Sequence, residues 1–480
     1  MPYLVVGVSI SLLMLFPSYS ISQLAKLTMW VVDAFGLGFI LFASAMFAVS
    51  IAIGMSRVGK VKLGGKTAVK EFTTFSWIAM LFTAGMGSGL IFWGVAEPAF
   101  HFANQPAIAK GFGDSLNTSL SLTYFHWGFH AWSIYTLSGL AIAWFSFNRG
   151  RSLKISSSFT EDDNKYKWLN WIAIVAIIFG VAGTVANSIA LAETGLLNLF
   201  SGASSSFGLR LVVILALALC FTLSSALGLQ KGIKRISLFN TLVMILLLGF
   251  VFIYLDPLNI TKLMLSSFVR YIEMLPALSF TIEDASRQWS LDWSVIYIVW
   301  WVAWTPFVGT FIARISKGRT VREFLVASIC VPTFASIFWF SSFGGEALTQ
   351  NVAAHIVQLV GQDYTLGLFE FFKLLPASVF LSVVAILLLL TFVVTSADSA
   401  IIVCCILGDN ESQSAKLVWA LPFILLSAIL VYINDVDLNK QVAIAGALPF
   451  TLIIVCQVFM MIKDMIQQRK KLATIDCAEC

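Results

Sequence analysis

Long apolar runs, interrupted by short polar breaks, extend over almost the whole chain. An α-helix needs about 20 predominantly apolar residues to cross the hydrocarbon core of a bilayer, and each run is long enough to do so. The pattern therefore predicts an all-α integral membrane protein with twelve transmembrane helices. The predicted spans are 4–20, 29–55, 76–98, 118–147, 168–198, 208–228, 236–255, 293–313, 324–343, 374–406, 415–433 and 441–462.

Composition indicates the same class of protein. Of the 480 residues, 59% are hydrophobic and 11% are charged, and the mean hydropathy is +0.90. The net charge of +5 requires no nucleic-acid partner, because the basic residues fall where membrane topology places them. The seven cysteines lack metal-ligand spacing, and no basic region precedes the first apolar run. Neither a cysteine metal centre nor a cleavable signal peptide is therefore expected.

Lysine and arginine are distributed unequally between the two sides that this topology defines. With a cytoplasmic N-terminus, 22 of the 30 Lys and Arg residues fall in inner loops or in the C-terminal segment. The positive-inside rule then places both termini in the cytoplasm. Residues 256–292 are too polar to span and are expected to contain an interfacial helix outside, and 344–373 is long enough to hold another.

The stretch 300–324 combines features that a lipid-facing helix has little reason to combine. Trp300, Trp301 and Trp304 lie close together, and a basic cluster that begins at Arg314 ends the apolar run. At 1.5 Å per residue, the indoles lie about 15 Å inside the boundary that this cluster marks. That depth favours a cavity wall over an interfacial aromatic belt, with plain packing as the alternative. Aromatic faces attract quaternary ammonium groups, so the hypothesis is a cage for an organic cation.

A second aromatic surface is predicted on the fourth span. At about 100° per residue, Trp127, Trp132 and Tyr135 fall within a sector of about 140°. Alone these side chains could be core, but with the eighth span they could form the other side of a prism around a cation. His126 and His130 in the same helix are expected to be hydrogen-bonded packing residues rather than ligands.

Two spans are irregular in a related way. The third contains Gly85, Gly87 and Gly89, and the eighth contains Pro306 and Gly309. The alternating glycines favour local unwinding of the helix, with close helix packing as the alternative. Two broken helices that lie five spans apart are what an inverted five-plus-five repeat gives, with substrate bound where the breaks meet.

The tenth span places hydroxyls and a carboxylate deep in an apolar segment, at Thr395, Ser396 and Asp398. An ionisable group inside a membrane is costly unless it is paired or solvated, which makes Asp398 a functional candidate. The two hydroxyls, with backbone carbonyls of the third span near Thr83 and Met86, would supply hard oxygen ligands for a small cation. The alternative is that the hydroxyls only bond back to their own helix.

Six motifs, spread over most of the chain, resemble those of the betaine/choline/carnitine transporter family. They lie at 75–77, 84–98 (AGMGSGLIFWGVAEP), 126–135, 231–233, 300–324 and 395–399. The resemblance implies a LeuT-type fold with 5+5 inverted repeats, usually assembled as a homotrimer. Its parts would be two leading transmembrane helices in 1–75, a first repeat in 76–255, an external interfacial segment in 256–292, a second repeat in 293–462 and a cytoplasmic tail in 463–480.

The resemblance also implies site residues. By position, the family's aromatic box for a trimethylammonium head would consist of Trp127, Trp132, Tyr135, Trp300, Trp301 and Trp304. Broken third-span backbone would meet the substrate carboxylate at Met86, Gly87 and Gly89, and Phe311 would belong to the cytoplasmic exit path. The family's common sodium site would be formed by the backbone carbonyls of Thr83, Met86 and Phe392 and the hydroxyls of Thr395 and Ser396.

Departures from the family's pattern narrow the expected sodium stoichiometry, substrate and regulation. Ile177 and Val181 stand where betaine symporters have two sodium-ligating threonines, so a single sodium site is expected. Asn240 stands where sodium-independent exchangers have an arginine, so no built-in cation replaces sodium there. Gly89 stands where some choline carriers have aspartate, which favours a zwitterionic betaine. The tail after Lys463 is short, so activation by osmotic stress is not expected.

Together these features predict a secondary active transporter, not an enzyme. It would import a trimethylammonium zwitterion, glycine betaine or a close analogue, across the bacterial inner membrane, with sodium as coupling ion and no further cofactor. Its partners would be the substrate, membrane lipid and further copies of the chain, and no nucleic acid. Alternatives are proton-driven uptake, sodium-independent exchange of choline- or carnitine-type substrates, and a non-transporting quaternary-amine sensor or membrane enzyme. No convergent nucleophile, base and metal set supports an enzyme.

Overall fold

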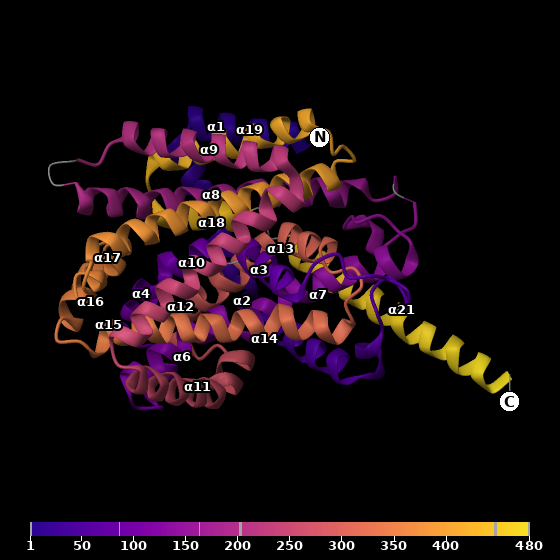
Figure 1. Ribbon diagram of the computed structural model, residues 1–480, viewed down its shortest axis with the longest axis horizontal. Helices are drawn as coiled ribbons and strands as arrows, with labels where there is room; N and C mark the ends of the chain where they lie inside the picture. Colours follow the sequence, from indigo (N-terminus) through magenta and orange to yellow (C-terminus); the bar gives the residue numbers. More distant parts are fainter. Residues whose placement is uncertain (1, 86, 163, 201–203, 446–448, 479–480) are drawn as a thin grey trace.

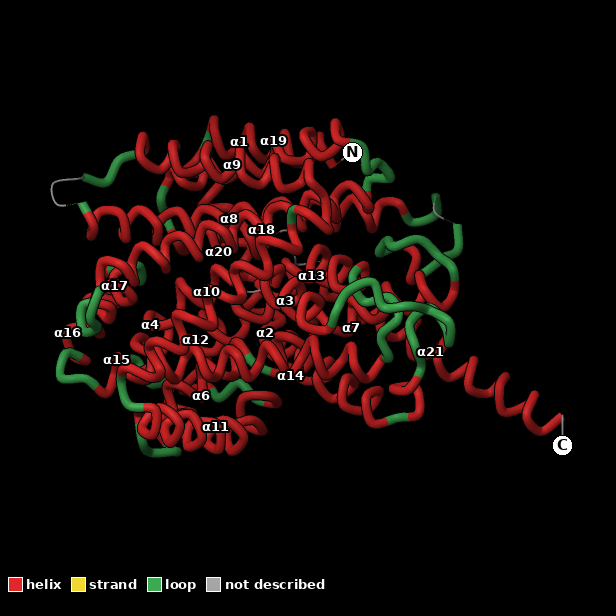
Figure 2. The backbone as a smooth tube through the Cα atoms, in the orientation of Figure 1, coloured by secondary structure: helices red, strands yellow, loops and turns green. Residues whose placement is uncertain are grey.

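The structure, a computed structural model, describes residues 2–85, 87–162, 164–200, 204–445 and 449–478. Within these ranges the chain is built from helices and their connections, as Figure 2 shows, and the one strand-like feature is an isolated bridge between Lys62 and Thr320. The all-α class that the apolar runs predict is thus confirmed.

The helices of the first half cover the two leading segments and the predicted first repeat. They are α1 (Pro2–Leu15), α2 (Pro17–Met55), α3 (Thr74–Gly85), α4 (Gly87–Ala103), α5 (Ala107–Lys110), α6 (Ser115–Trp127), α7 (Phe129–Ala143), α8 (Lys167–Leu199), α9 (Phe207–Lys231) and α10 (Ile233–Tyr254). Short 3-10 or π segments lie at η1 (Arg57–Lys60), η2 (Trp144–Asn148) and η3 (Ser156–Ser158).

The second half of the chain is also built from helices. Its helices are α11 (Pro257–Phe280), α12 (Arg287–Ser290), α13 (Ile296–Arg314), α14 (Val321–Phe340), α15 (Glu346–Thr349), α16 (Ala353–Gln362), α17 (Leu366–Phe372), α18 (Ser378–Leu407), α19 (Gln413–Ile433), α20 (Val436–Ala445) and α21 (Phe450–Ala478). Short 3-10 or π segments lie at η4 (Asp284–Ser286), η5 (Leu291–Val295) and η6 (Ser341–Gly345).

Fewer candidate spans lie among the described residues than the twelve that the sequence predicts. Among the described residues, ten helices are long and apolar enough to cross a membrane, or up to eleven if the bent pair α3 and α4 counts as one span. α1 is too short for this test, with 14 residues, and the predicted fourth span forms two shorter helices, α6 and α7. The chain is a multi-pass membrane protein; twelve spans and the inverted repeat stay predictions.

The segment 256–292 differs from expectation. It forms a helix, as predicted, but α11 has 24 residues and is apolar enough to count among the candidate spans by length and composition. The sequence argument that this segment is too polar to span is therefore not supported. α16 and α17 occupy the second segment that the sequence predicts to be long enough for a helix.

The two irregular spans behave differently. The helix axes of α3 and α4 differ by 60°, with the break at residue 86, and Met86 lies outside the described residues. α13, in contrast, continues without interruption through Pro306, so the predicted break in the eighth span is wrong. Thr305 and Thr310 donate their hydroxyls to the carbonyls of Trp301 and Pro306, each at 2.8 Å, within this unbroken helix.

The arrangement of helices places α13 at the centre. It packs against α7, α8 and α18, and Figure 1 shows it between the upper group, which includes α8 and α9, and the lower group, which includes α14 and α11. The fourth predicted span is split at Gly128, where a Cβ atom would lie 2.4 Å from the carbonyl oxygen of Tyr124. The split presents α6 and α7 to the same central space as α13.

Candidate functional site: an aromatic cavity beside α13

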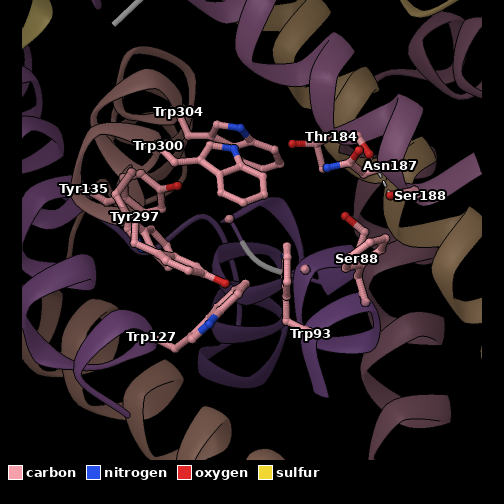
Figure 3. A pocket seen from close by; sticks show the side chains of 14 residues that line it. Ser88, Trp93, Trp127, Tyr135, Thr184, Asn187, Ser188, Tyr297, Trp300 and Trp304 are labelled. Carbon is pink, nitrogen blue, oxygen red and sulfur yellow. Dashed lines mark hydrogen bonds between the residues drawn. The ribbon is translucent and has the colours of Figure 1, made fainter. Parts of the chain in front are cut away.

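A cavity of about 50 Å³ lies between α4, α6, α7, α8 and α13. Mainly aromatic walls with a few polar groups are typical of small-molecule sites. Figure 3 shows aromatic side chains along one side and small polar side chains on the other. The lining residues are Gly85, Ser88, Gly89, Phe92, Trp93, Trp127, Tyr135, Thr184, Asn187, Ser188, Tyr297, Trp300, Trp301 and Trp304.

Trp301 is at the centre of the aromatic wall. Its ring centroid lies 5.0 Å from that of Tyr135, 5.6 Å from that of Trp127 and 5.7 Å from that of Trp132. The Trp127 and Trp301 planes stand at 85° to each other, so the two indoles form a corner. The predicted aromatic residues of the fourth and eighth spans are therefore brought together.

Trp132 differs from the other five residues of the predicted box. It packs edge-on against Tyr135, at 5.7 Å between ring centroids, and lies behind the cavity surface rather than on it. A Cβ atom on Gly85 would lie 3.1 Å from the edge of its ring. In this conformation Trp132 supports the wall, and a direct contact with substrate stays a prediction.

The polar edges of three cavity indoles, those of Trp127, Trp301 and Trp304, bind protein acceptors. The Nε1 atom of Trp301 donates to the carbonyl of His126 at 3.0 Å, and that of Trp304 donates to the carbonyl of Gly180 at 3.2 Å. Trp127 donates to the carboxylate of Glu97 at 2.7 Å. With their N–H groups bound elsewhere, these rings offer the cavity their electron-rich faces, which is the surface that binds a cation.

Glu97 is fully buried behind the aromatic wall. Its carboxylate accepts hydrogen bonds from Trp127, from the Tyr297 hydroxyl and from Nδ1 of His126, the last at 2.7 Å. Nε2 of His126 in turn bonds the Ser294 hydroxyl at 2.9 Å. The prediction that His126 is a hydrogen-bonded packing residue is confirmed. Glu97, which carries no specific signal in the sequence, anchors two cavity side chains.

The same cluster has the geometry of a possible metal site. Ligand atoms of Glu97, His101 and His126 lie within 4.8 Å of one another. The carboxylate already accepts hydrogen bonds from His126, Trp127 and Tyr297, so the protein itself satisfies its hydrogen-bonding capacity. His130, the other predicted packing histidine, bonds the Ser279 hydroxyl at 3.0 Å.

The three alternating glycines each accept an aromatic ring at close range. A Cβ atom on Gly89 would lie 2.7 Å from the Trp127 ring, and one on Gly87 would lie 1.8 Å from the Phe392 ring. No side chain fits at these distances, so the glycines allow α4 to approach α6 and α18. Close packing, the alternative to unwinding, therefore accounts for these two glycines, while Gly85 closes α3 at the break.

The residues of the predicted sodium site lie in the buried region where α3, α10 and α18 pack together. Thr395 donates its hydroxyl to the Phe392 carbonyl at 2.8 Å, which is the back-bonding alternative. Ser396 forms no such bond to its own helix, and among the described residues its buried Oγ has no hydrogen-bond partner. The Thr83 hydroxyl bonds the Ser237 hydroxyl at 2.7 Å. The predicted donor set, backbone carbonyls and two hydroxyls, fits a hard cation. Met86, the remaining predicted ligand, lies outside the described residues.

Asn240 and Asp398 complete the polar groups of this region. Both amide atoms of Asn240 are buried, and neither has a hydrogen-bond partner among the residues that the structure describes. Asp398 is fully buried on α18 and accepts a hydrogen bond from Ser224 of α9. The costly carboxylate predicted from the sequence is thus partnered by a hydroxyl of a neighbouring helix.

Phe311 is not part of the aromatic cavity. It is buried and lines a separate cavity with Arg314 at the end of α13 and residues of α18 and α19. The fifth-span positions Ile177 and Val181 are buried aliphatic side chains, as the departure from the family's pattern requires. A role of Phe311 in substrate exit stays a prediction.

Several lining residues were missed by sequence reasoning, although each had a signal. Tyr297 lies one helical turn before Trp301 and so shares its face of α13. Trp93 lies one turn after Gly89 within the glycine motif. Thr184, Asn187 and Ser188 are polar side chains in the middle of the apolar run 168–198, which is itself a signal.

The comparison with known proteins decides the family. The model of the betaine/carnitine/choline family transporters matches residues 1–470. The chain belongs to this family. The resemblance noted in the sequence is confirmed, and so is the expectation that the protein is a transporter rather than an enzyme.

Individual members of the betaine/carnitine/choline family are about one-third identical to the chain over nearly its full length. The glycine betaine transporter OpuD of Bacillus subtilis is 33% identical over 473 residues, 94% of this chain and 90% of that protein. A glycine betaine/proline/choline/ectoine transporter of Vibrio parahaemolyticus is 33% identical over 487 residues, 96% and 85% of the two chains. An ectoine/hydroxyectoine transporter of Virgibacillus pantothenticus is 31% identical over 430 residues, 87% and 86% of the two chains.

Proposed function

We propose that the protein imports a trimethylammonium zwitterion, glycine betaine or a close analogue, by secondary active transport. The observation that carries the proposal is the corner formed by Trp127 and Trp301 in a cavity also lined by Tyr135, Tyr297 and Trp304. A quaternary ammonium group has no N–H to donate, so ring faces are the surface that it binds best. The names of relatives such as the Bacillus subtilis glycine betaine transporter agree with this substrate class.

The buried carboxylate of Glu97 favours the same head group. It lies directly behind Trp127 and Tyr297, to which it is hydrogen-bonded. A negative charge on that side of the wall attracts a cation in the cavity and repels an anion, and the attraction is strong where water is excluded. The ammonium end of a zwitterion is therefore expected against this wall.

Sodium is the proposed coupling ion, bound at one site. Ser396, Thr395 and the Phe392 carbonyl on α18, with Thr83 on α3, would hold it, and the ion would supply positive charge that ties the two helices together. Sodium shifts the protein towards a substrate-competent state only to the extent that it binds that state more tightly. The aliphatic side chains of Ile177 and Val181 oppose a second site.

The proposal also covers the topology, location and oligomeric state of the protein. Both termini lie in the cytoplasm of a bacterial cell, the protein resides in the inner membrane, and three copies associate in lipid. The distribution of lysine and arginine supports the orientation. The residue ranges of the two repeats and of the external segment remain part of the same proposal.

A thermal-shift panel on the purified protein tests the substrate and the ion together. Glycine betaine, carnitine, choline and dimethylsulfoniopropionate are each added with sodium and with potassium. Glycine betaine is expected to raise the midpoint most, and more in sodium, because a ligand that binds only the folded state stabilises it by mass action. A larger shift with choline, or equal shifts in the two salts, would contradict the substrate or the coupling ion, respectively.

A further inference from the structure

The side of the cavity opposite the aromatic wall is formed by polar side chains of α8. Asn187 and Ser188 follow Thr184 by three and four residues, so both lie beside it on one side of the helix. Figure 3 shows them across the cavity from Trp127 and Tyr297. α8 is otherwise apolar over this stretch, and polar groups in such a helix are costly unless they are bonded.

Two of the three polar side chains, Thr184 and Ser188, donate their hydroxyl protons to carbonyls of α8 itself. The Thr184 hydroxyl donates to the carbonyl of Gly180 at 3.3 Å, and the Ser188 hydroxyl donates to the carbonyl of Thr184 at 2.8 Å. Both bonds lie within α8, as is common for hydroxyls in apolar helices. What these side chains still offer to the cavity are oxygen lone pairs.

Asn187 is different because its amino group has no acceptor among the described residues. Its Oδ1 accepts a hydrogen bond of 2.7 Å from Nδ2 of Asn439, while its own Nδ2 has no partner among the residues that the structure describes. The side chain is 4% exposed, so bulk water does not satisfy this donor. Figure 3 shows the Asn187 amide nitrogen on the cavity side. A buried donor without an acceptor is unfavourable, and a ligand that accepts from it removes that cost.

Asn439 fixes which end of the amide faces the cavity. It lies on α20, which packs along α8, and it is 2% exposed. By donating to Asn187 Oδ1, it holds the oxygen away from the cavity and leaves the amino group towards it. The two asparagines thus act as a pair, one that faces the cavity and one that orients it.

The two sides of the cavity therefore differ in electrostatic character: one side is negative, and the other carries a hydrogen-bond donor. The buried carboxylate of Glu97 lies behind Trp127 and Tyr297, and the amino group of Asn187, unpartnered among the described residues, faces them from α8. A molecule with a positive head and a negative tail fits this arrangement in one direction. A simple cation such as choline satisfies the aromatic wall but offers no anion to the amino group.

We propose that Asn187 is a specificity-determining residue that donates a hydrogen bond to the carboxylate of a zwitterionic substrate. Asn439 is its positioning residue. The proposal rests on the proposed function, since it assigns the second end of the same substrate. The family resemblance places the third-span backbone against the substrate carboxylate. The present proposal adds the Asn187 side chain as a second donor to that carboxylate.

Binding measurements on the purified full-length protein test this assignment, with glycine betaine, choline and tetramethylammonium as probes. Tetramethylammonium carries only the head group and reports whether the aromatic wall is intact. Asn187→Leu is expected to weaken glycine betaine at least tenfold and to change tetramethylammonium less than threefold. Asn187→Asp, which has the same shape, is expected to weaken glycine betaine further and to strengthen choline.

The positioning role is tested with Asn439→Asp. An aspartate there can only accept, so the Asn187 amino group turns towards it and leaves the cavity. Glycine betaine affinity is expected to fall, with tetramethylammonium affinity retained. Asn198→Leu and Asn198→Asp, on an exposed part of the same helix, are the matched controls and are expected to change neither ligand.

The outcomes separate this inference from the proposed function. Unchanged glycine betaine affinity in Asn187→Leu, or equal losses for glycine betaine and tetramethylammonium, would overturn the role of Asn187 while leaving the aromatic site in place. A wild-type protein that binds tetramethylammonium and choline but not glycine betaine would overturn both. Selective loss of glycine betaine in the Asn187 and Asn439 variants alone is the supporting result.

Discussion

The indole Nε1 of Trp127 donates a 2.7 Å hydrogen bond to the buried carboxylate of Glu97. The bond joins α6 to α4 and fixes the angle at which Trp127 meets Trp301. A hydrogen bond to a charged acceptor is about twice as strong as one between neutral groups. It also directs negative charge towards the ring that forms the corner of the cavity, so shape and electrostatics at this corner depend on one carboxylate.

Replacement of Glu97 by glutamine tests that dependence. Glu97→Gln keeps the volume but removes the charge and turns one acceptor into a donor, and we expect tetramethylammonium affinity to fall about tenfold, or about 1.4 kcal/mol. Isothermal titration calorimetry provides the measurement. Glu193→Gln is the matched control: Glu193 is a buried glutamate of α8, paired with Arg210 at 3.4 Å, and its loss should leave this affinity unchanged. Equal affinities for the Glu97 variant and wild type would contradict the electrostatic role.

Trp304→Ala tests the aromatic wall itself. Trp304 lines the cavity and packs against Phe307 at 5.1 Å between ring centroids. Loss of one ring face from a desolvated ammonium site is expected to cost about 1–2 kcal/mol of glycine betaine affinity. Trp168→Ala is the control, because Trp168 is 52% exposed at the start of α8. A dissociation constant that does not change in Trp304→Ala would exclude this tryptophan from the cage.

The close approach of α4 and α6 gives a third prediction. Gly89→Ala would place a methyl group 2.7 Å from the Trp127 ring, so the ring must move and the corner must open. We expect a loss of glycine betaine affinity together with a lower melting temperature, because overpacking costs about 1–3 kcal/mol of folding stability. Gly249→Ala in α10 meets nothing within 4 Å and serves as control. If Gly89→Ala binds like wild type while its melting temperature is unchanged, the contact has no role in binding.

Sodium dependence provides a fourth prediction. With one site, glycine betaine uptake should follow sodium concentration with a Hill coefficient near one. Ser396→Ala should raise the sodium concentration needed for half-maximal uptake, because it removes a buried hydroxyl with no partner among the described residues. Thr391→Val on the same helix removes a hydroxyl bonded to Leu387 and should not do so. Clear cooperativity, with two sodium ions per substrate, would refute the single site.

Much of the aromatic site can be predicted because its residues repeat at helical spacing within single spans. The sequence alone places Trp300 and Trp304 on one face of a helix, and it places Trp127 and Tyr135 within one sector of another. Polar residues at mid-span are visible in the sequence too, but Asn187 acquires its role only through Asn439, 252 positions later in the chain. A local pattern cannot show which distant side chain leaves a donor free.

The differences between prediction and structure have physical causes of the same kind. Pro306 predicts a break, yet helix neighbours on several sides hold α13 continuous, since tertiary packing outweighs one lost backbone bond. Gly128 lies inside an apolar run that predicts one continuous span, but its backbone is non-helical, with φ −103° and ψ −141°, and this divides the span there. Glu97 lies at the end of a predicted span, and its role depends on His126, Trp127 and Tyr297, which come from other helices.

Uptake of radiolabelled glycine betaine into proteoliposomes tests the central claim most directly. The purified protein is reconstituted, and an inward sodium gradient is imposed, with an equal potassium gradient and protein-free vesicles as controls. The account predicts accumulation above the external concentration that requires sodium and is reduced in Trp304→Ala. Binding of glycine betaine without accumulation, or accumulation that is equal in potassium, would contradict it.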